Sequence, residues 1–443
     1  MRKEHNVKHI GRSLRLGLLV LAAIACIAIA GDKPARAGST AHRGVWVAFY
    51  EFSAAGLSNR TEAAFRQNAT KMFEEIKSYG CNEVYFHVRA FDDAIYPSKI
   101  VKWSTYMESN GKSPGYDPLA ILVELAHAKG LKLHAWMNPY RVTTSSILNP
   151  GKKKTINRIV SQVKEIIDNY DVDGIHFDDY FYVGSTYSNV NSKKRRKYVN
   201  KMVKQVHDTV KAKSENLQFG ISPAGNYENC MEMGADVKTW MSEKGYIDYI
   251  IPQIYWTDQY MMNGKMTALF TERTELWRSL NKIDLPMYIG LGVYRAGHAE
   301  KDVKPDYGWA RSITNLQDQI KIIKAGNTEG YTLFAYTDMI NSRTVDEMDG
   351  LLEEISKLKL NKTSVTLKVG ETFTLTTKWK PDKYIYGDDP DFMSLDESIA
   401  TVDEYGVITA VAPGTVKIRA YTDTKKKACT VTVEEVDAEP VVE

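Results

Sequence analysis

Cysteine is scarce in this chain, and its scarcity excludes two kinds of stabilising site. The 443 residues include four cysteines, which lie far apart at Cys26, Cys81, Cys230 and Cys429. Disulfide-rich domains and structural zinc sites need cysteines or histidines at close, regular spacings. We therefore expect no disulfide framework, no metal site and no other cofactor.

An excess of one charge is also lacking once the N-terminal segment is set aside. The whole chain has a formal net charge of +3, but residues 1–37 hold seven Lys or Arg and two Asp or Glu. The rest of the chain therefore has 51 basic and 53 acidic residues. The basic run 193–197 follows Ser192, a typical N-cap, and precedes a helical pattern, so we interpret it as a solvated helix face. Nucleic acid is therefore not an expected partner.

Long apolar runs are missing except near the N-terminus. Five Lys or Arg residues lie between positions 2 and 15, an apolar run of 15 residues follows from Leu16 to Ala30, and Ala35-Arg-Ala37 has the small-x-small pattern of a cleavage site. A membrane span needs roughly 20 apolar residues. We predict a signal peptide over residues 1–37, a secreted or envelope-associated protein, and no stable membrane span after cleavage. The alternative is a retained N-terminal anchor.

A β-then-α alternation repeats eight times after this segment. The candidate strands start about 30 to 50 residues apart, which leaves room for a helix in each interval. They cover residues 44–50, 83–89, 132–138, 174–179, 217–222, 249–256, 287–294 and 331–336. Eight such units predict an α/β fold, a (β/α)8 TIM barrel, over residues 42–357.

The character of the sequence changes after residue 358. Short, alternating runs rich in Thr and Val predict a small all-β sandwich over residues 359–435, with a flexible tail over 436–443. The motifs Leu367-Lys-Val-Gly-Glu371 and Gly406-Val-Ile-Thr-Ala-Val-Ala-Pro-Gly-Thr-Val416 resemble the bacterial immunoglobulin-like domain of group 2. The resemblance implies an extracytoplasmic adhesion or spacer module that contacts the envelope or carbohydrate and performs no chemistry.

Polar and aromatic side chains alternate with apolar ones in several candidate strands. The polar faces of 83–89 and 132–138 carry Tyr85, His87, Arg89, His134, Trp136 and Asn138, and Gln253 and Tyr255 share a face of the sixth strand. The C-terminal ends of barrel strands meet at one mouth. Burying so many polar groups there without a ligand would require an unusually complete hydrogen-bond network. We interpret this face as a ligand pocket.

The segment Asp173-Gly-Ile-His-Phe-Asp-Asp-Tyr-Phe-Tyr182 ends the fourth strand with two adjacent carboxylates. Alternation directs Asp178 inward, whereas Asp179 faces away unless the strand has already ended. Two acidic groups that flank a glycosidic bond are enough to hydrolyse it. We predict Asp178 as the principal catalytic carboxylate, with Asp179 or Asp93 as its partner. The structural alternative for Asp178 is an ion pair with a neighbouring arginine.

Six motifs, in order along the chain, are similar to those of the bacterial family-10-like glycosyl hydrolases. They are Arg43-Gly-Val-Trp46, Val88-Arg-Ala-Phe-Asp-Asp-Ala-Ile-Tyr-Pro-Ser98, His134-Ala-Trp-Met-Asn-Pro-Tyr-Arg141, Gly174-Ile-His-Phe-Asp-Asp-Tyr-Phe-Tyr182, Ile221-Ser-Pro223 and Pro252-Gln-Ile-Tyr-Trp256. This family includes a division-associated enzyme that acts on peptidoglycan glycan strands stripped of their peptides. The resemblance implies a groove lined by Arg89, Asp93, His134, Asn138, His176, Asp178, Asp179, Gln253 and Tyr255.

Further aromatic residues are candidates for substrate contact. Trp46, Trp136 and Trp256 are potential sugar-stacking platforms, and Tyr180 adjoins the two carboxylates. The layout of residues 173–180 is also similar to the fourth-strand signature of family-18 chitinases, in which the N-acetyl group of the substrate is the nucleophile and a final glutamate is the acid. Tyr180 stands at the position of that glutamate, so substrate-assisted cleavage would need another acid, such as Asp178 or Asp179.

Together these features predict an exported glycoside hydrolase that cleaves a cell-wall glycan by carboxylate acid/base chemistry, with peptide-free peptidoglycan strands as the first candidate substrate. Two alternatives remain open, a catalytically inactive carbohydrate-binding envelope protein and a hydrolase of another extracellular polysaccharide. A metal-dependent hydrolase or deacetylase would need clustered ligands that the sequence does not present.

Overall fold

The computed structural model describes residues 41–183, 187–326, 328, 330–352, 357–380, 391–403, 405–421 and 426–435. The predicted signal peptide over residues 1–37 and the predicted tail over 436–443 lie outside the described residues. Within the described ranges, no helix combines the length and the hydrophobicity needed to cross a bilayer.

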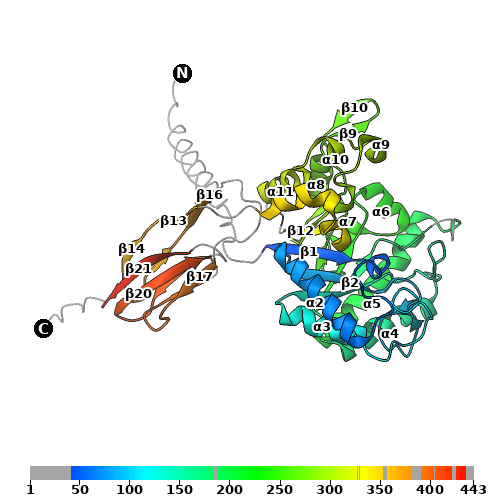
Figure 1. The fold of residues 1–443 in the computed structure, drawn as a ribbon, viewed down its shortest axis with the longest axis horizontal. Coiled ribbons are helices and arrows are strands. Elements are labelled where there is room, and N and C mark those ends of the chain that lie inside the picture. The colour runs from blue at the N-terminus through cyan, green and yellow to red at the C-terminus, as the bar shows by residue number, and fades with distance from the viewer. Residues whose placement is uncertain are drawn as a thin grey trace, which may run out of the picture.

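Eight parallel strands form one curled sheet in the order β11-β12-β1-β2-β5-β6-β7-β8 (Figure 1). Their bounds are β1 (His42–Val47), β2 (Glu83–Arg89), β5 (Lys132–Met137), β6 (Gly174–Asp178), β7 (Gln218–Ser222), β8 (Tyr249–Ile250), β11 (Ile289–Leu291) and β12 (Gly330–Leu333). Two isolated parallel bridges, Ile250 with Met287 and Gln253 with Gly290, join the segments of β8 and β11, so the sheet returns on itself. The predicted TIM-barrel fold is confirmed, and each strand overlaps its predicted range.

Three predicted strands run past the point where the chain leaves the sheet. The 3-10 helices η1 (Phe49–Glu51) and η2 (Val293–Arg295) and the helix α12 (Tyr336–Met339) stand where strand ends were expected. The sequence there is aromatic and apolar, so periodicity alone does not separate it from strand. These turns place side chains across the mouth of the barrel.

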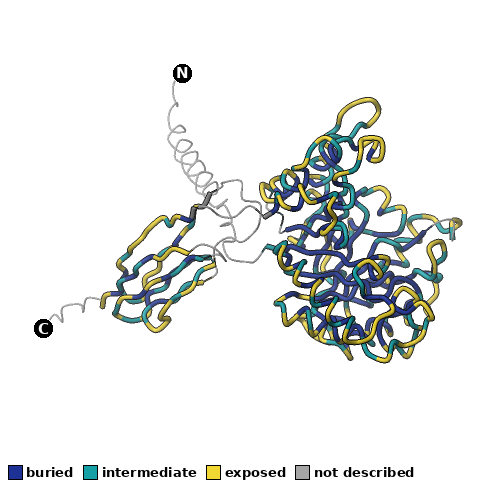
Figure 2. The backbone as a smooth tube through the Cα atoms, in the orientation of Figure 1, coloured by how far each residue is buried: buried dark blue, intermediate teal, exposed yellow. Residues whose placement is uncertain are grey.

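Amphipathic helices surround the sheet (Figure 1), and Figure 2 shows buried strands inside an exposed outer layer. The longer ones are α2 (Glu62–Ser78), α3 (Pro118–Ala128), α4 (Lys153–Asn169), α5 (Ser192–Lys213), α8 (Leu269–Leu280) and α11 (Asn315–Ala325). Thr61 caps α2 by accepting a hydrogen bond from the Ala64 backbone N–H. The N-cap of α5 is Asn191, whose side chain accepts from the Lys194 N–H, so the prediction of Ser192 as cap is wrong by one residue.

The shorter elements occupy the connections between these strands and helices. They are β3 (Asp93–Ala94), β4 (Lys102–Trp103), α6 (Tyr227–Met233), α7 (Val237–Trp240), β9 (Tyr260–Met262), β10 (Lys265–Thr267), α9 (Glu300–Val303), α10 (Gly308–Arg311), η3 (Ser342–Thr344), α13 (Val345–Asp349) and η4 (Gly350–Leu352). The parallel pair of β3 and β4 follows the C-terminal end of β2.

The predicted alternation of strand faces is confirmed in β2 and β5. Val84 and Leu133 pack in the outer core beneath the helices, whereas Tyr85 and Trp136 belong to a separate buried cluster inside the barrel. Glycines on neighbouring strands make room for the large interior side chains. A Cβ atom on Gly220 would lie 2.2 Å from the Tyr249 ring, so this position requires glycine for close approach.

The C-terminal residues form a small all-β unit, as predicted. Its strands are β13 (Lys357–Leu360), β14 (Ser364–Lys368), β15 (Thr372–Thr374), β16 (Thr377–Lys380), β17 (Asp391–Ser394), β18 (Ala400–Val402), β19 (Val407–Ala410), β20 (Gly414–Tyr421) and β21 (Lys426–Glu434). The sheets β14-β21-β20-β17 and β15-β19-β18 enclose a core of their own, which includes Leu375, Ile408, Ile418 and Val431.

Candidate active site

A cavity of about 260 Å³ opens at the C-terminal ends of the barrel strands, and we call it the active-site cavity. Its walls come from the ends of several strands and from the turns that follow them. The lining residues are Trp46, Phe49, Tyr50, His87, Trp136, Asn138, Arg141, Asp178, Tyr180, Ser222, Gln253, Tyr255 and Phe334. Six of the twelve predicted site residues therefore meet in one place, namely Asp178, Trp136, Asn138, Tyr180, Gln253 and Tyr255.

Asp178 is the last residue of β6 and is 6% exposed. Its Oδ1 atom accepts hydrogen bonds from Gln253 Nε2 at 3.0 Å and from the Asp179 backbone N–H at 2.7 Å. Gln253 Nε2 also donates to the Ser222 carbonyl oxygen at 2.9 Å. Because groups from β6, from the end of β7 and from the segment after β8 hold it, the carboxylate has one fixed orientation in the cavity.

Asp179 lies just beyond the strand end, and its side chain hydrogen-bonds that of Asp178. Burial raises the pKa of both carboxyl groups, and the charge of Asp178 raises the pKa of Asp179 further, well above its ordinary range. Two adjacent buried carboxyl groups do not both ionise, so the pair keeps one proton between them. This acidic pair can therefore both donate a proton and carry a negative charge.

Arg141 brings a positive charge to the cavity. Its guanidinium carbon lies 4.0 Å from the centroid of the Tyr180 ring and 5.2 Å from that of Phe91, so two aromatic faces hold it in place. The described residues include no ion pair between Arg141 and a carboxylate, and none between Asp178 and an arginine. The structure therefore gives no support to the ion-pair alternative for Asp178.

Five residues that line the cavity carry buried polar atoms with no hydrogen-bond partner among the described residues. These atoms are Nδ1 and Nε2 of His87, Trp136 Nε1, Asn138 Oδ1, Arg141 Nε and the Tyr255 hydroxyl. Buried polar atoms are normally paired, and each unpaired one costs roughly 1–3 kcal/mol. The set includes donors, acceptors and a hydroxyl that is both, and the Trp136, Asn138 and Tyr255 atoms among them match the hydroxyl and amide groups of an amino sugar.

Arg89 and Asp93 do not line the active-site cavity. The register of β2 against β5 shifts between His87 and Arg89, and this bulge reverses the side of the sheet on which the Arg89 side chain lies. The fully buried guanidinium donates to the Asn138 carbonyl oxygen and to Asp92 Oδ1. Strict alternation placed Arg89 inside the barrel, and the bulge makes that placement wrong. Asp93 accepts from the Phe91 N–H at 3.1 Å and lines a neighbouring cavity instead.

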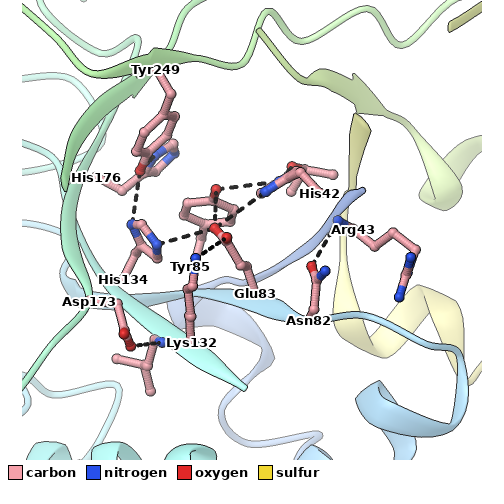
Figure 3. A network of polar contacts seen from close by, with 12 residues as sticks. His42, Arg43, Asn82, Glu83, Tyr85, Lys132, His134, Asp173, His176 and Tyr249 are labelled. Carbon is pink, nitrogen blue, oxygen red and sulfur yellow. Dashed lines mark hydrogen bonds and ion pairs between the residues drawn. The ribbon is translucent and has the colours of Figure 1, made fainter. Parts of the chain in front are cut away.

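His134 and His176 lie beneath the cavity in a buried hydrogen-bond network (Figure 3). Trp46 Nε1 donates to His176 Nε2 at 3.1 Å, and the Tyr249 hydroxyl lies 3.1 Å from His176 Nδ1 and 3.1 Å from His134 Nδ1. His134 Nε2 is 3.2 Å from Glu83 Oε2. An indole N–H only donates and a carboxylate only accepts. His176 therefore carries its proton on Nδ1, Tyr249 donates to His134 Nδ1, and His134 Nε2 faces the Glu83 carboxylate at ion-pair distance.

These two histidines do not reach the surface of the cavity, so their predicted contact with substrate stays a prediction. Both are fully buried and neither lines the cavity, because the third and fourth strands carry them one layer deeper than Trp136 and Asp178. Burial lowers the pKa of His176 well below its usual value, so it is neutral. His176 Nε2 lies 3.0 Å from Ser222 Oγ, which does line the cavity, so the network supports the cavity floor.

We expect Tyr249→Phe to lower the free energy of unfolding by roughly 1–3 kcal/mol, because two buried imidazole nitrogens lose their shared partner. Urea denaturation of the variant and the wild type measures the difference. Tyr307→Phe is the control, because its ring lies under Arg311 in a cation–π contact outside this network. A Tyr249→Phe variant as stable as the control would contradict the directed network.

Trp256 and Asp179 are the remaining predicted residues that do not line the cavity. The ring of Trp256 packs against Gly225, and its carbonyl oxygen accepts from Gln319 Nε2 at 2.8 Å. Trp256 therefore does not line the cavity, and its contact with substrate stays a prediction. Asp179 contacts the site through its hydrogen bond with Asp178. Strand β6 ends at Asp178, so the alternation of the strand no longer fixes the direction of the Asp179 side chain.

Seven further residues line the cavity, namely Trp46, Phe49, Tyr50, His87, Arg141, Ser222 and Phe334; the sequence suggested Trp46 as a stacking platform and His87 as inward-facing, and the other five were not predicted to contact the substrate. His87 stacks on Trp136 with ring centroids 3.8 Å apart, in phase with the other inward residues of β2. Arg141 and Ser222 lie within or beside recognisable strand ends, so strand phase could have found them. Phe49, Tyr50 and Phe334 follow strand ends, where the turn decides their direction.

Glu51 shows why a carboxylate near a strand end need not be catalytic. Its Oε1 accepts from the backbone N–H and the hydroxyl of Thr337 at 2.7 and 2.6 Å, and its Oε2 accepts from the Ala48 N–H at 2.6 Å. Burial raises the pKa of Glu51 to about 7. Glu51 joins η1 to α12 and does not line the cavity. Among the described residues that do, Asp178 is the one carboxylate.

The described part of the chain contains no group of three or more His, Cys, Asp or Glu side chains arranged to hold a metal ion. The chemistry of the cavity must therefore be assigned from the acidic pair, Arg141 and the unpartnered donors and acceptors around them.

Comparison with known proteins identifies the family of the barrel and of the C-terminal unit. The sequence pattern of the glycosyl hydrolase-like 10 family matches residues 41–147 and 141–309, and that of the bacterial Ig-like domain (group 2) matches residues 355–433. Glycosyl hydrolase DigH of Escherichia coli K12 is 28% identical over 389 residues, covering 70% of this chain and 87% of DigH. Glycosyl hydrolase YngK of Bacillus subtilis 168 is 29% identical over 352 residues, covering 64% of this chain and 66% of YngK.

A solved structure shares the barrel fold. The glycoside hydrolase domain of PgaB (BpsB) from Bordetella bronchiseptica superposes with a TM-score of 0.50 at 9% sequence identity, covering 70% of this chain and 99% of that domain. The family match spans more than half of the chain, and Asp178 lines the cavity at the C-terminal ends of the barrel strands. This chain is therefore a glycoside hydrolase that belongs to the glycosyl hydrolase-like 10 family.

Proposed function

We propose that this enzyme cleaves an amino-sugar-containing cell-wall glycan outside the cytoplasm, with peptide-free peptidoglycan strands as its substrate. The observation that carries the proposal is the set of unpartnered atoms of Trp136, Asn138 and Tyr255 around the acidic pair. An N-acetylated sugar offers hydroxyl groups, an amide N–H and an amide carbonyl, so it can satisfy a donor, an acceptor and a phenol together.

Arg141 supports a preference for strands that have lost their peptides. Removal of the peptide leaves a free carboxylate on every second sugar, whereas an intact strand carries an uncharged amide there. Arg141 lines the cavity and has no carboxylate partner among the described residues. A charge-assisted hydrogen bond to the freed carboxylate is stronger than one to a neutral amide. The guanidinium therefore favours the stripped strand.

The single lining carboxylate supports substrate-assisted cleavage. The acidic pair donates its one shared proton through Asp178 to the leaving glycosidic oxygen as the bond to the anomeric carbon breaks. The carbonyl oxygen of the N-acetyl group forms the new bond to that carbon, and the negative charge left on the pair stabilises the positively charged ring that results. Water then opens the ring and returns a proton to the pair. The Tyr255 hydroxyl orients the acetamido group.

Two features outside the cavity support an extracytoplasmic location. The basic and apolar segments of residues 1–37 have the order of a signal peptide. The match of residues 355–433 to the group 2 Ig-like domain adds a module of the kind found in bacterial proteins outside the cell. We propose that this module keeps the barrel near the wall glycan.

The test compares three substrates for the purified enzyme, namely intact peptidoglycan, peptide-free strands and peptide-free strands whose amino groups have been deacetylated. New reducing ends are identified by mass spectrometry. We expect cleavage of the peptide-free strands at least roughly tenfold faster than of intact ones, the scale of one charge-assisted contact, and none of the deacetylated strands. Equal rates of cleavage of intact and of peptide-free strands would show that Arg141 does not select for the freed carboxylate. Rapid cleavage of the third would exclude the N-acetyl nucleophile.

A further inference from the structure

A second cavity, of about 570 Å³, opens beside the first and takes no part in the chemistry above. It lies between the end of β2, the β3 and β4 segment and the chain after β5. We call it the side cavity and define it by Phe91, Asp92, Lys102, Tyr106, Thr143 and Arg158. Its volume is within the range of ligand pockets, and its walls mix aromatic, charged and hydroxyl groups.

The two cavities share a wall. Phe49 lines the active-site cavity, and its ring centroid lies 5.2 Å from that of Phe91 and 4.5 Å from that of Tyr106, both of which line the side cavity. Arg141 lines the first cavity and Thr143 the second. One row of rings and one loop therefore separate the two hollows, so a single chain molecule can occupy both.

The floor of the side cavity is rigid and polar. Arg158 Nη2 lies 3.0 Å from each oxygen of Asp92, and Arg89 Nη2 lies 3.2 Å from Asp92 Oδ1. The bulge in β2 that removes Arg89 from the active-site cavity is therefore what directs it toward this floor. Lys102 is exposed at the edge, and no carboxylate among the described residues pairs with it.

We propose that the side cavity is a sugar-binding subsite for another unit of the glycan chain whose reacting unit occupies the active-site cavity. The inference rests on the proposed function for the identity of the chain. The Tyr106 ring, 38% exposed, offers an apolar face against which a pyranose ring stacks. Three polar side chains that line the same cavity can form hydrogen bonds with the hydroxyl groups of that sugar, namely Asp92, Arg158 and Thr143. The enzyme therefore gains affinity with chain length.

The experiment uses the whole enzyme with N-acetylated glycan oligomers of increasing length. Tyr106→Leu removes the ring face, Tyr106→Phe restores it, and Tyr307→Leu is a matched truncation outside both cavities. We expect kcat/KM of the wild type to rise with oligomer length. Tyr106→Leu should lose roughly three- to tenfold on long oligomers, the scale of one aromatic contact, and less on the shortest. Tyr106→Phe should restore the rise. A Tyr106→Leu variant that matches Tyr307→Leu at every length would overturn the subsite.

A second measurement separates this proposal from the proposed function. Titration calorimetry of the same oligomers in an Asp178→Asn background reports binding without turnover. Weaker binding of long oligomers by Tyr106→Leu in that background supports the subsite even if the wild type cleaves none of them. Thr144→Met narrows the side cavity from its exposed opposite wall and should give the same length-dependent loss. Unchanged binding by both variants would exclude the subsite, whatever the activity of the wild type.

Discussion

Asp178→Asn should lower kcat on the glycan by roughly a thousandfold, the middle of the range for loss of a general acid. The substitution is isosteric, and its amide oxygen can still accept from Gln253 Nε2 and from the Asp179 N–H. It cannot deliver a proton to the leaving oxygen or carry the negative charge that stabilises the positive ring. The loss should fall on kcat, with KM little changed, because the shape of the cavity is kept. Reducing-end release from peptide-free strands measures it.

Asp117→Asn is the matched control for this substitution. Asp117 caps α3 through hydrogen bonds from the Leu119 and Ala120 N–H groups, away from both cavities, and asparagine is an equally good N-cap. The control should keep wild-type activity, and thermal unfolding should show that both variants are folded. A folded Asp178→Asn enzyme with a tenth or more of the wild-type kcat would assign the chemistry to another group.

Asp179→Asn should shift the alkaline limb of the activity profile to lower pH. In the wild type, burial and the adjacent charge raise the pKa of Asp179 well above its usual value, so the pair keeps its proton as the pH rises. Activity is lost only when the pH passes through that raised pKa. In the variant, Asp178 must hold the proton alone, and Arg141 opposes the rise in its pKa. The acid therefore deprotonates at lower pH.

The size of the effect depends on the pH at which it is measured. Near pH 7 we expect Asp179→Asn to lose roughly a hundredfold in kcat, and near pH 5 much less, because Asp178 is then still protonated in a larger share of molecules. The profile of kcat/KM between pH 4 and 9 measures the shift. An alkaline limb that stays in place while the whole profile drops uniformly would show that Asp179 orients the site without holding the proton.

Strand phase explains how much of this site the sequence predicted. Alternation predicted that Trp136, Asn138 and Asp178 face inward, and all three line the cavity, because they lie at the ends of β5 and β6, where the phase of the strand still fixes the side of the sheet. Arg89 was misplaced because one extra residue in β2 reverses the phase, and no residue type there marks the bulge. The fold was easier to predict, because eight strand and helix units repeat a signal that no single irregularity removes.

The sequence also did not predict how deep in the barrel each inward-facing side chain lies. Alternation says that His134, His176 and Trp136 all face inward, but it does not say which layer of the interior each occupies. The register of β5 against β6, with Trp136 opposite His176, sets that layer. Such pairings depend on the tilt of every strand in the closed sheet. The residues of the turns, such as Phe49 and Phe334, had no phase to follow at all.

The stability and the activity of this enzyme fall at acidic pH for two separate reasons. The histidine network beneath the cavity determines the first, and the acidic pair determines the second. Burial lowers the pKa of His42, and that of His176 falls well below the usual value, so both stay neutral in the folded barrel. Below about pH 6.5 these histidines bind protons in the unfolded chain but not in the folded chain. The free energy of unfolding therefore falls as the pH falls. Catalysis meets its own acid limit at the mouth, where a second proton on the acidic pair abolishes its charge. At acidic pH the enzyme therefore loses activity through protonation of the acidic pair, and it loses stability through the buried histidines.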